Sequence, residues 1–196
     1  SWLAAIASAF RDPELALAGG ECLPDYESAP PAWVESLWKE GEDSGLLFAF
    51  SLIRRVGPLR PISPFHVFGC NYAVRKSVLL KGGGFHPDAV PLTKLRYRGD
   101  GESSISTYVQ QAGLKCLHVP GAEVRHRVPR ERMTPEYLYR RYFMQAVSDS
   151  FTRIRRNGRA DWVSHTTRIL EEIAGWLPGP AAPWGRHARR CGGGID

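Results

Sequence analysis

The alternation of hydrophobic and polar positions near the start of the chain predicts a helix followed by a buried strand. Hydrophobic residues from Trp2 to Phe10 recur at helical spacing, and Asp12 with Pro13 ends that helix. The short apolar run 15–20 comes next and predicts a strand that is buried on both faces. A helix followed by a strand is typical of an α/β protein.

The pattern is less regular between the first strand and the glycine-rich middle of the chain. Hydrophobic residues in 33–53 predict helix in several pieces. Next come a predicted strand at 65–68, a tight turn at 69–71 and a return strand at 72–74. A short helix is predicted at 77–81, closed by three consecutive glycines that permit positive φ.

Helical and extended patterns alternate again after a long irregular segment. Residues 85–98 show no clean period and predict a loop. A helix is expected from about Glu102 to Gly113, where the glycine stops it. Short strands are predicted at 114–119 and 122–125.

The last part of the chain is predicted to be helical and then loose. Thr134 is a good helix cap and Pro135 a good first residue for a helix that runs to about residue 155. An amphipathic helix is predicted at 161–177. The chain therefore divides into a domain at 1–133, a helical extension at 134–177 and a flexible tail at 178–196 that is rich in glycine, proline and arginine.

Composition and charge add a preference for anionic partners. The chain has 196 residues, 43% of them hydrophobic, which is enough for a real core. Its net charge of +6 comes from one stretch, because residues 125–160 hold ten arginines against three acidic residues. Such a block attracts nucleotide phosphates, nucleic acid or an anionic lipid surface, and charge alone does not choose among them.

The cysteines and the hydropathy favour a reduced, intracellular protein without a membrane span. Cys22, Cys70, Cys116 and Cys191 show neither a C-x-x-C pair nor metal-ligand spacing, so we interpret them as small core residues or bystanders. No apolar run reaches the roughly 20 residues needed to cross a bilayer. The chain starts at Ser1, directly in a predicted helix, so we expect that upstream sequence is missing.

Two acidic residues at a helix start are the sharpest candidates for chemistry. Asp100 and Glu102 open the predicted helix, where the helix dipole keeps a carboxylate ionised and therefore able to act as a general base. The alternative is that one of them only caps the helix. An acidic pair could also bind a divalent cation, although such sites usually need more ligands.

Two further features join these carboxylates as candidates. His126 follows a predicted strand and is itself followed by Arg130 and Arg132, a combination suited to a metal ion or a diphosphate, although a single histidine is more often structural. The turn 69–71 and the glycines at 82–84 would place a polar side chain and flexible backbone near a cleft. The alternative for this feature is an ordinary hairpin and helix cap.

The order of these features resembles the second half of family 2 glycosyltransferases. That family typically shows G-x-N-x-A-x-R, G-G-F, an acidic G-E-D-like motif, A-G, P-x-A and H-x-x-P-x-x-R. This chain reads FGCNYAVR at 68–75, GGGF at 82–85, GDGE at 99–102, AG at 112–113, VPGA at 119–122 and HRVPRER at 126–132. The segment 15–33, which ends in PPAW, is similar to the stretch that follows the acidic metal-binding motif of the family.

The resemblance implies an incomplete GT-A fold, an α/β fold with a mixed sheet, flanking helices and a C-terminal helical extension. A Rossmann-like half with a D-x-D motif would bind the nucleotide-diphospho-sugar with Mg or Mn, and the half present here would bind a saccharide or lipid-linked acceptor. The implied reaction is inverting sugar transfer to an acceptor hydroxyl in cell-envelope or exopolysaccharide synthesis. Without the D-x-D half we expect the chain alone to be inactive.

The resemblance also implies roles for particular residues. It assigns the catalytic base to Glu102 with Asp100 as second choice, the metal ligand to His126, diphosphate binding to Arg130 and Arg132, and substrate binding in the cleft to Asn71 and Gly69. The usual G-E-D is replaced by GDGE in this chain, which leaves the choice between the two acids open.

Two other functions and one location remain as alternatives or expectations. A nucleic-acid-binding module would use the arginines of the helix from residue 134, and a non-catalytic remnant of a transferase would use none of these groups. The transferase interpretation predicts no nucleic-acid partner. It predicts a cytoplasmic protein held on the inner face of the membrane by the arginines and the 161–177 helix, although core packing would also explain that helix.

Overall fold

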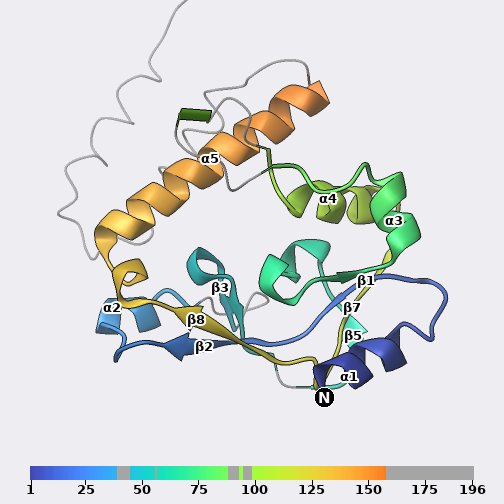
Figure 1. Cartoon of the computed structure of the whole chain (residues 1–196), viewed down its shortest axis with the longest axis horizontal. Helices are drawn as coiled ribbons and strands as arrows, with labels where there is room; N and C mark the ends of the chain where they lie inside the picture. The colour runs from blue at the N-terminus through green and yellow to red at the C-terminus, as the bar shows by residue number, and fades with distance from the viewer. Residues whose placement is uncertain (39–44, 56, 88–92, 95–98, 158–196) are drawn as a thin grey trace, which may run out of the picture.

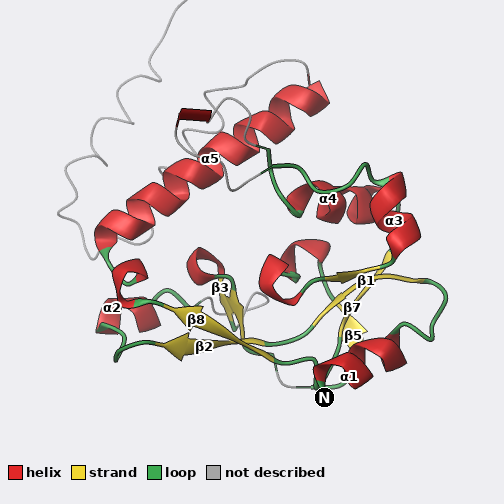
Figure 2. Cartoon of the chain, in the orientation of Figure 1, coloured by secondary structure: helices red, strands yellow, loops and turns green. Residues whose placement is uncertain are grey.

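A computed structural model describes residues 1–38, 45–55, 57–87, 93–94 and 99–157 as an α/β protein with two mixed four-stranded sheets (Figures 1 and 2). The strand orders are β5-β7-β1-β6 and β3-β4-β2-β8. The strands are β1 Leu15–Gly19, β2 Cys22–Tyr26, β3 Leu46–Leu47, β4 Leu52–Ile53, β5 Arg60–Pro61, β6 Ala73–Val74, β7 Lys115–His118 and β8 Val124–Val128. The α-helices are α1 Trp2–Ala9, α2 Ala32–Glu35, α3 Lys76–Lys81, α4 Ser103–Gln111 and α5 Pro135–Asn157, with 3-10 turns η2 Phe48–Phe50, η3 Pro64–His66, η4 Gly69–Asn71 and η6 Arg130–Arg132.

One pair of parallel strands is continued from the first sheet into the second. β1 pairs with β7 and β2 pairs with β8, both in parallel, and only short links separate β1 from β2 and β7 from β8. The two chain segments touch at the junction between the sheets, because a Cβ added to Gly20 would lie 2.1 Å from the Ala122 carbonyl oxygen. Glycine is therefore required where the strands change sheets.

Separate hydrophobic clusters attach the helices to the two sheets. Leu17 of β1 packs in one cluster with Ile105 and Val109 of α4, and α3 and α4 lie above the first sheet in Figure 1 with α1 below it. Val128 of β8 belongs to a second cluster, against which the first turns of α5 pack through residues that include Tyr137. α5 is thus fixed at its start to the second sheet and reaches across toward α4 (Figure 1).

Most of the strongly periodic segments fold as the sequence predicts. The structure confirms the first helix and strand as α1 and β1, the short helix as α3, and the helix after GDGE as α4. It confirms 114–119 as β7 and the long helix as α5, with Thr134 as its cap: the Thr134 Oγ1 accepts the Tyr137 N–H at 3.2 Å. The mixed α/β class is confirmed as well.

The predicted strand at 65–68 is wrong, because that segment contains the 3-10 turn η3. Pro64 occupies its first turn, and the Ser63 hydroxyl accepts the Phe65 N–H at 3.3 Å as a cap. A capping serine followed by proline is a helix-start signal that outweighs the apolar character of the segment. The return strand exists as β6, but it pairs antiparallel with β1 and forms no local hairpin.

Helix was also the wrong prediction for part of 33–53. The short helix α2 and the turn η2 are present, yet Leu46–Leu47 and Leu52–Ile53 form an antiparallel pair, and 39–44 lie outside the described residues. No sequence pattern predicts β2, and β8 is displaced relative to the predicted strand 122–125, so that His126 lies inside it. The predicted helix 161–177 and tail 178–196 fall outside the described residues, as does most of the predicted loop 85–98.

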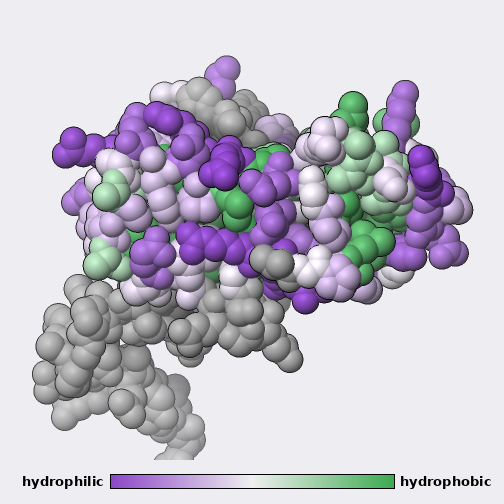
Figure 3. Space-filling view, turned by 90° about the horizontal axis from the view of Figure 1, so that it is seen from below, coloured by the Kyte–Doolittle hydropathy of each residue, from purple (hydrophilic) through white to green (hydrophobic). Residues whose placement is uncertain are grey.

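The face seen from below in Figure 3 is hydrophilic over most of its visible described part, and hydrophobic colours gather toward the end that carries α1. Among the described helices, none combines the length and apolar character required to cross a membrane.

Candidate functional site

The turn η4 brings the start of α4 to the edge of the second sheet. The Gly69 N–H donates to Glu102 Oε1 at 3.2 Å, across 33 residues of sequence. A Cβ on Gly69 would lie 3.1 Å from the same oxygen, so glycine permits this close approach. Glu102 stands at the N-cap position of α4 but makes no side-chain capping bond, and the capping alternative is therefore wrong for this residue.

Cys70 is the next residue of the turn and lies between three groups. Its Sγ is 3.6 Å from Sγ of the buried Cys22 and 3.7 Å from the Ser51 carbonyl oxygen. A hydrogen bond with Cys22 lowers the pKa of the exposed Cys70 thiol, and the neighbouring His126 lowers it further, whereas desolvation opposes the shift. The same thiol–thiol contact, together with burial, raises the pKa of Cys22.

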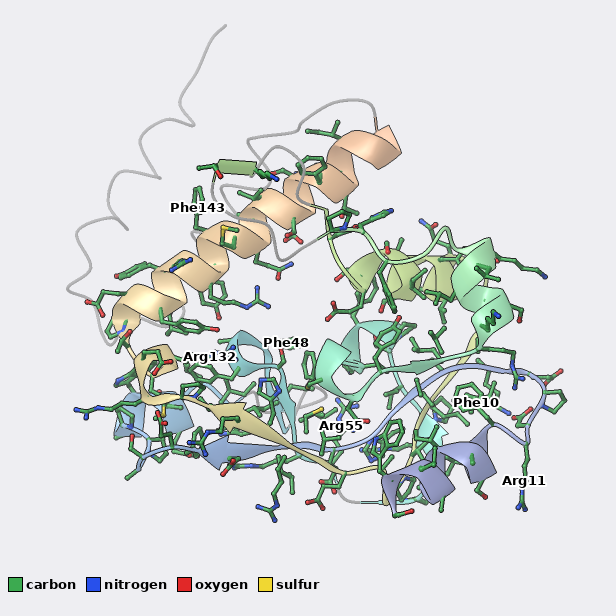
Figure 4. All side chains as sticks on the ribbon, viewed as in Figure 1. Phe10, Arg11, Phe48, Arg55, Arg132 and Phe143 are labelled. Carbon is green, nitrogen blue, oxygen red and sulfur yellow. The ribbon has the colours of Figure 1, made fainter. Side chains whose placement is uncertain are left out.

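His126 reaches this turn because of its position in β8. Arg125 and Arg127 are exposed, whereas His126 is half-buried and Val128 buried, as the two-residue period of a strand requires. The Arg132 Nη1 lies 3.4 Å from His126 Nε2, and the Arg132 guanidinium lies 5.8 Å from the Tyr137 ring centroid. Figure 4 shows Arg132 between β8 and α5.

Asn71, in contrast, points into the junction between the two sheets. Its Oδ1 accepts the Trp2 indole N–H at 2.7 Å, and its Nδ2 donates to the carbonyl oxygens of Glu21 at 3.0 Å and Ala122 at 2.7 Å. The side chain is 2% exposed. Its amide therefore joins α1 to both strands at the junction and is occupied by the protein itself.

Asp100 is also buried and occupied. One of its oxygens lies 2.5 Å from His86 Nδ1, and the other accepts the hydroxyl of Thr152 on α5. The residue is 8% exposed. Asp100 thus fastens the segment before α4 to α5, and of the two candidate acids Glu102 is the more open to a ligand.

The arginine-rich segment is anchored to β2 through acidic side chains. Arg127 forms ion pairs with Asp25 and Glu27, and the Arg130 backbone N–H donates to Glu27 at 2.9 Å. The hydrogen bond from Arg130 is the main cause of the lowered pKa of the Glu27 carboxyl, and Arg127 adds to it. The Arg130 side chain is exposed, so its guanidinium points to solvent at one end of this segment.

The structure therefore joins some of the predicted site residues and separates others. Gly69 and Glu102 meet at the turn, with His126 and Arg132 on its other side and Cys70 between them. The side chains of Asn71, Asp100 and Arg130 have other surroundings. Sequence reasoning missed the contribution of Cys70, His86 and Thr152; only Cys70 had a signal, because it lies within the G-x-N motif itself.

The described residues do not fit a magnesium or manganese site. No group of three or more histidine, cysteine or carboxylate side chains in this part of the chain is arranged to hold a metal ion. Next to His126 stands a thiol, whereas Mg and Mn prefer oxygen ligands. His126 could supply at most one ligand to an ion held mainly by other residues.

Comparisons of the chain with protein-family models, with curated proteins and with solved structures give no match in any of the three.

Proposed function

We propose that the chain is the acceptor-side, catalytic part of an inverting nucleotide-sugar glycosyltransferase of the GT-A type, acting in cell-envelope or exopolysaccharide synthesis. The observation that carries the proposal is that Glu102 and His126, 24 residues apart in the sequence, both lie beside the turn η4, Glu102 at Gly69 and His126 at Cys70. Both belong to the ordered motifs that resemble family 2, and the turn belongs to another motif of that set. If each motif served only its own local turn or helix cap, the fold would have no reason to bring the motifs together.

In this proposal Glu102 is the general base. Among the described residues, its carboxylate accepts a hydrogen bond only from the Gly69 N–H, through Oε1. That bond fixes the orientation of the half-buried carboxylate and leaves Oε2 to receive the proton of an acceptor hydroxyl as this attacks the anomeric carbon. A single displacement inverts the configuration at that carbon.

Arginines of the segment after β8 offset the charge of the leaving nucleoside diphosphate. Arg132 is held near His126 and the Tyr137 ring, and Arg130 extends into solvent beside it. Guanidinium groups suit this task because they bind phosphate oxygens in pairs. The described residues supply no site for a divalent cation.

The arginines give less support to a nucleic-acid-binding module. On β8, Arg127 is paired with Asp25 and Glu27, and on α5 the Arg141 guanidinium donates to Gln145. Phosphate binding by these groups would compete with partners that the fold already supplies. We therefore propose no second function.

An anionic membrane surface is the proposed docking partner. Tyr139, Phe143 and Ile154 on α5 are exposed, and their spacing puts them on one face of the helix beside the exposed Arg140. Phe143 points away from the sheets in Figure 4. An apolar stripe bordered by arginine is typical of helices that lie in the lipid interface.

Vesicle sedimentation tests this docking. We expect the chain to sediment with phosphatidylglycerol vesicles at low salt and to remain in solution with phosphatidylcholine vesicles. Phe143→Glu should reduce the bound fraction several-fold, whereas Gln110→Glu, a change at an exposed position of α4, should reduce it less. Absence of sedimentation with the anionic vesicles at low salt would remove the membrane proposal.

Turnover of a nucleotide sugar by the polypeptide of the complete reading frame tests the enzymatic proposal. Glu102→Gln keeps the shape and the bond from Gly69 but removes the base, so kcat should fall by about 100-fold or more. Asp100→Asn should lower kcat less, because the two oxygens of the buried Asp100 carboxylate are occupied by His86 and Thr152.

Glu123→Gln is the matched control, because Glu123 is exposed and pairs only weakly with Arg125 at 3.8 Å. This variant should turn over like the unchanged protein. Equal kcat values for Glu102→Gln and Glu123→Gln would exclude Glu102 as the base.

A further inference from the structure

Two thiols from distant parts of the chain meet at the edge of the candidate site. Cys22 begins β2 and is fully buried, whereas Cys70 is exposed in the turn η4. Their Sγ atoms are 3.6 Å apart, and both thiols are free. A disulfide has an S–S distance of about 2.05 Å, so the two sulfurs need to approach by roughly 1.5 Å.

We propose that Cys22 and Cys70 are a redox-active pair that closes into a reversible disulfide when the protein meets a low-molecular-weight disulfide oxidant. The pairing is specific because both positions are held by the fold. Asn71 fixes the turn next to Cys70 through its bonds to Glu21 and Ala122, and Glu21 directly precedes Cys22. The third described cysteine, Cys116, is buried in the cluster between β1 and α4.

The reaction follows ordinary thiol–disulfide exchange. The exposed Cys70 loses its proton to water and its thiolate attacks one sulfur of the oxidant, for example oxidised glutathione. This forms a mixed disulfide and releases one molecule of reduced glutathione. The Cys22 sulfur then attacks Cys70 Sγ while its proton passes to the leaving glutathione thiolate, which departs as the second reduced glutathione. Two protein thiols are thereby oxidised and one glutathione disulfide is reduced to two thiols.

The exposure of the two sulfurs sets the order of these steps. Cys22 has no exposed surface, so the oxidant reaches Cys70 first, and Cys22 acts as the resolving thiol from inside the protein. Closure draws Cys70 Sγ toward the buried Cys22. The inference does not depend on the proposed glycosyl transfer, since its product is read from protein mass alone.

The test is to treat the full chain with oxidised glutathione, block the remaining thiols with an alkylating reagent, and map the peptides by mass. The expected product has lost two hydrogen atoms and contains a Cys22–Cys70 linked peptide, which reductant separates again. Because the bond closes a long loop, the midpoint of thermal unfolding should rise, by up to about 10 °C. The same product should form in the Cys116→Ser and Cys191→Ser variants.

Two variants separate a resolving pair from a merely reactive thiol. In Cys22→Ala, Cys70 should carry one glutathione that persists, because no second thiol displaces it. In Cys70→Ala, the buried Cys22 should remain unmodified. This second variant tests the order of the steps even if Cys22→Ala folds poorly. The proposal is overturned if the unchanged chain ends as a glutathione adduct at Cys70, if Cys70 stays unreacted, or if either cysteine links to Cys116 or Cys191 instead.

Discussion

Neighbouring residues of one turn, Cys70 and Asn71, belong to regions of opposite character. Asn71 lies in the sheet junction, where every polar atom of its amide has a partner at 2.7–3.0 Å. Cys70, in contrast, is exposed and lies near His126, and the Gly69 N–H beside it donates to Glu102. The motif that contains both residues therefore joins a buried structural half to an exposed half.

The difference shows how a polar residue in a motif can be assigned to structure or to chemistry. A buried amide whose donors and acceptor are all used by the protein has no capacity left for a substrate, and its loss should appear in stability. A half-buried carboxylate such as Glu102, with one bond from Gly69, retains an oxygen for a reacting group. Removing it should appear in turnover.

The largest effect on stability is expected for Asn71→Ala. The change leaves the Trp2 indole N–H and the carbonyl oxygens of Glu21 and Ala122 without their partner in the junction. The free energy of unfolding should fall by about 4 kcal/mol, measured by urea denaturation. The matched control is the adjacent Cys70→Ala, which should lose less than about 1 kcal/mol because Cys70 is exposed. Similar losses of unfolding free energy in the two variants would contradict the assignment of Asn71 to the buried junction and of Cys70 to the exposed half of the turn.

A smaller effect on stability is expected at His118. This residue is buried beside the junction but, unlike Asn71, lacks hydrogen-bond partners of normal geometry for its side chain among the described residues. His118 pairs in register with Gly19 and is 1% exposed, and neither of its ring nitrogens makes a hydrogen bond of normal geometry, although the Arg55 backbone lies near. Burial lowers the pKa of the imidazole, the nearby Arg55 backbone opposes this shift, and the charges of Arg60 and Arg55 add to the lowering. The unfolded chain therefore binds a proton more readily than the folded protein.

The sign of the pH dependence follows from that lowered pKa. Stability should decrease as pH falls through the unfolded-state histidine pKa of about 6.5, because protonation then favours the unfolded chain. In His118→Leu the slope of unfolding free energy between pH 7 and pH 5 should be shallower, as measured by urea denaturation at each pH. An unchanged slope would contradict this prediction, because it would mean that the folded protein stabilises protonated His118 enough to offset its burial.

Sequence predicted the elements whose pattern is local and strong. α1, α4 and α5 carry clear helical spacing with recognisable starts or stops, and β1 is a short continuous apolar run. The run 46–53 is apolar except for Ser51 and is buried at most positions, so its period could not distinguish helix from hairpin. β2 contains Pro24 and a polar residue, and it exists because of long-range pairing with β8.

The candidate site was predictable as a set of motifs but not as a geometry. Residue type and motif order indicate Glu102 and His126, and the structure places both beside the same turn. The motif predicts Asn71 as a cleft residue, whereas its side chain lies in the junction, because a G-x-N pattern does not say which way the amide points. The contact of Cys22 with Cys70 depends on the pairing of β2 and could not be read from cysteine spacing.

The anomeric configuration of the sugar product, followed by NMR during turnover with the polypeptide of the complete reading frame, decides whether Glu102 is the base of an inverting transfer. We expect a product of configuration opposite to that of the donor, and almost no product from Glu102→Gln. A product of retained configuration, or undiminished formation of product by the Glu102 variant, would contradict it.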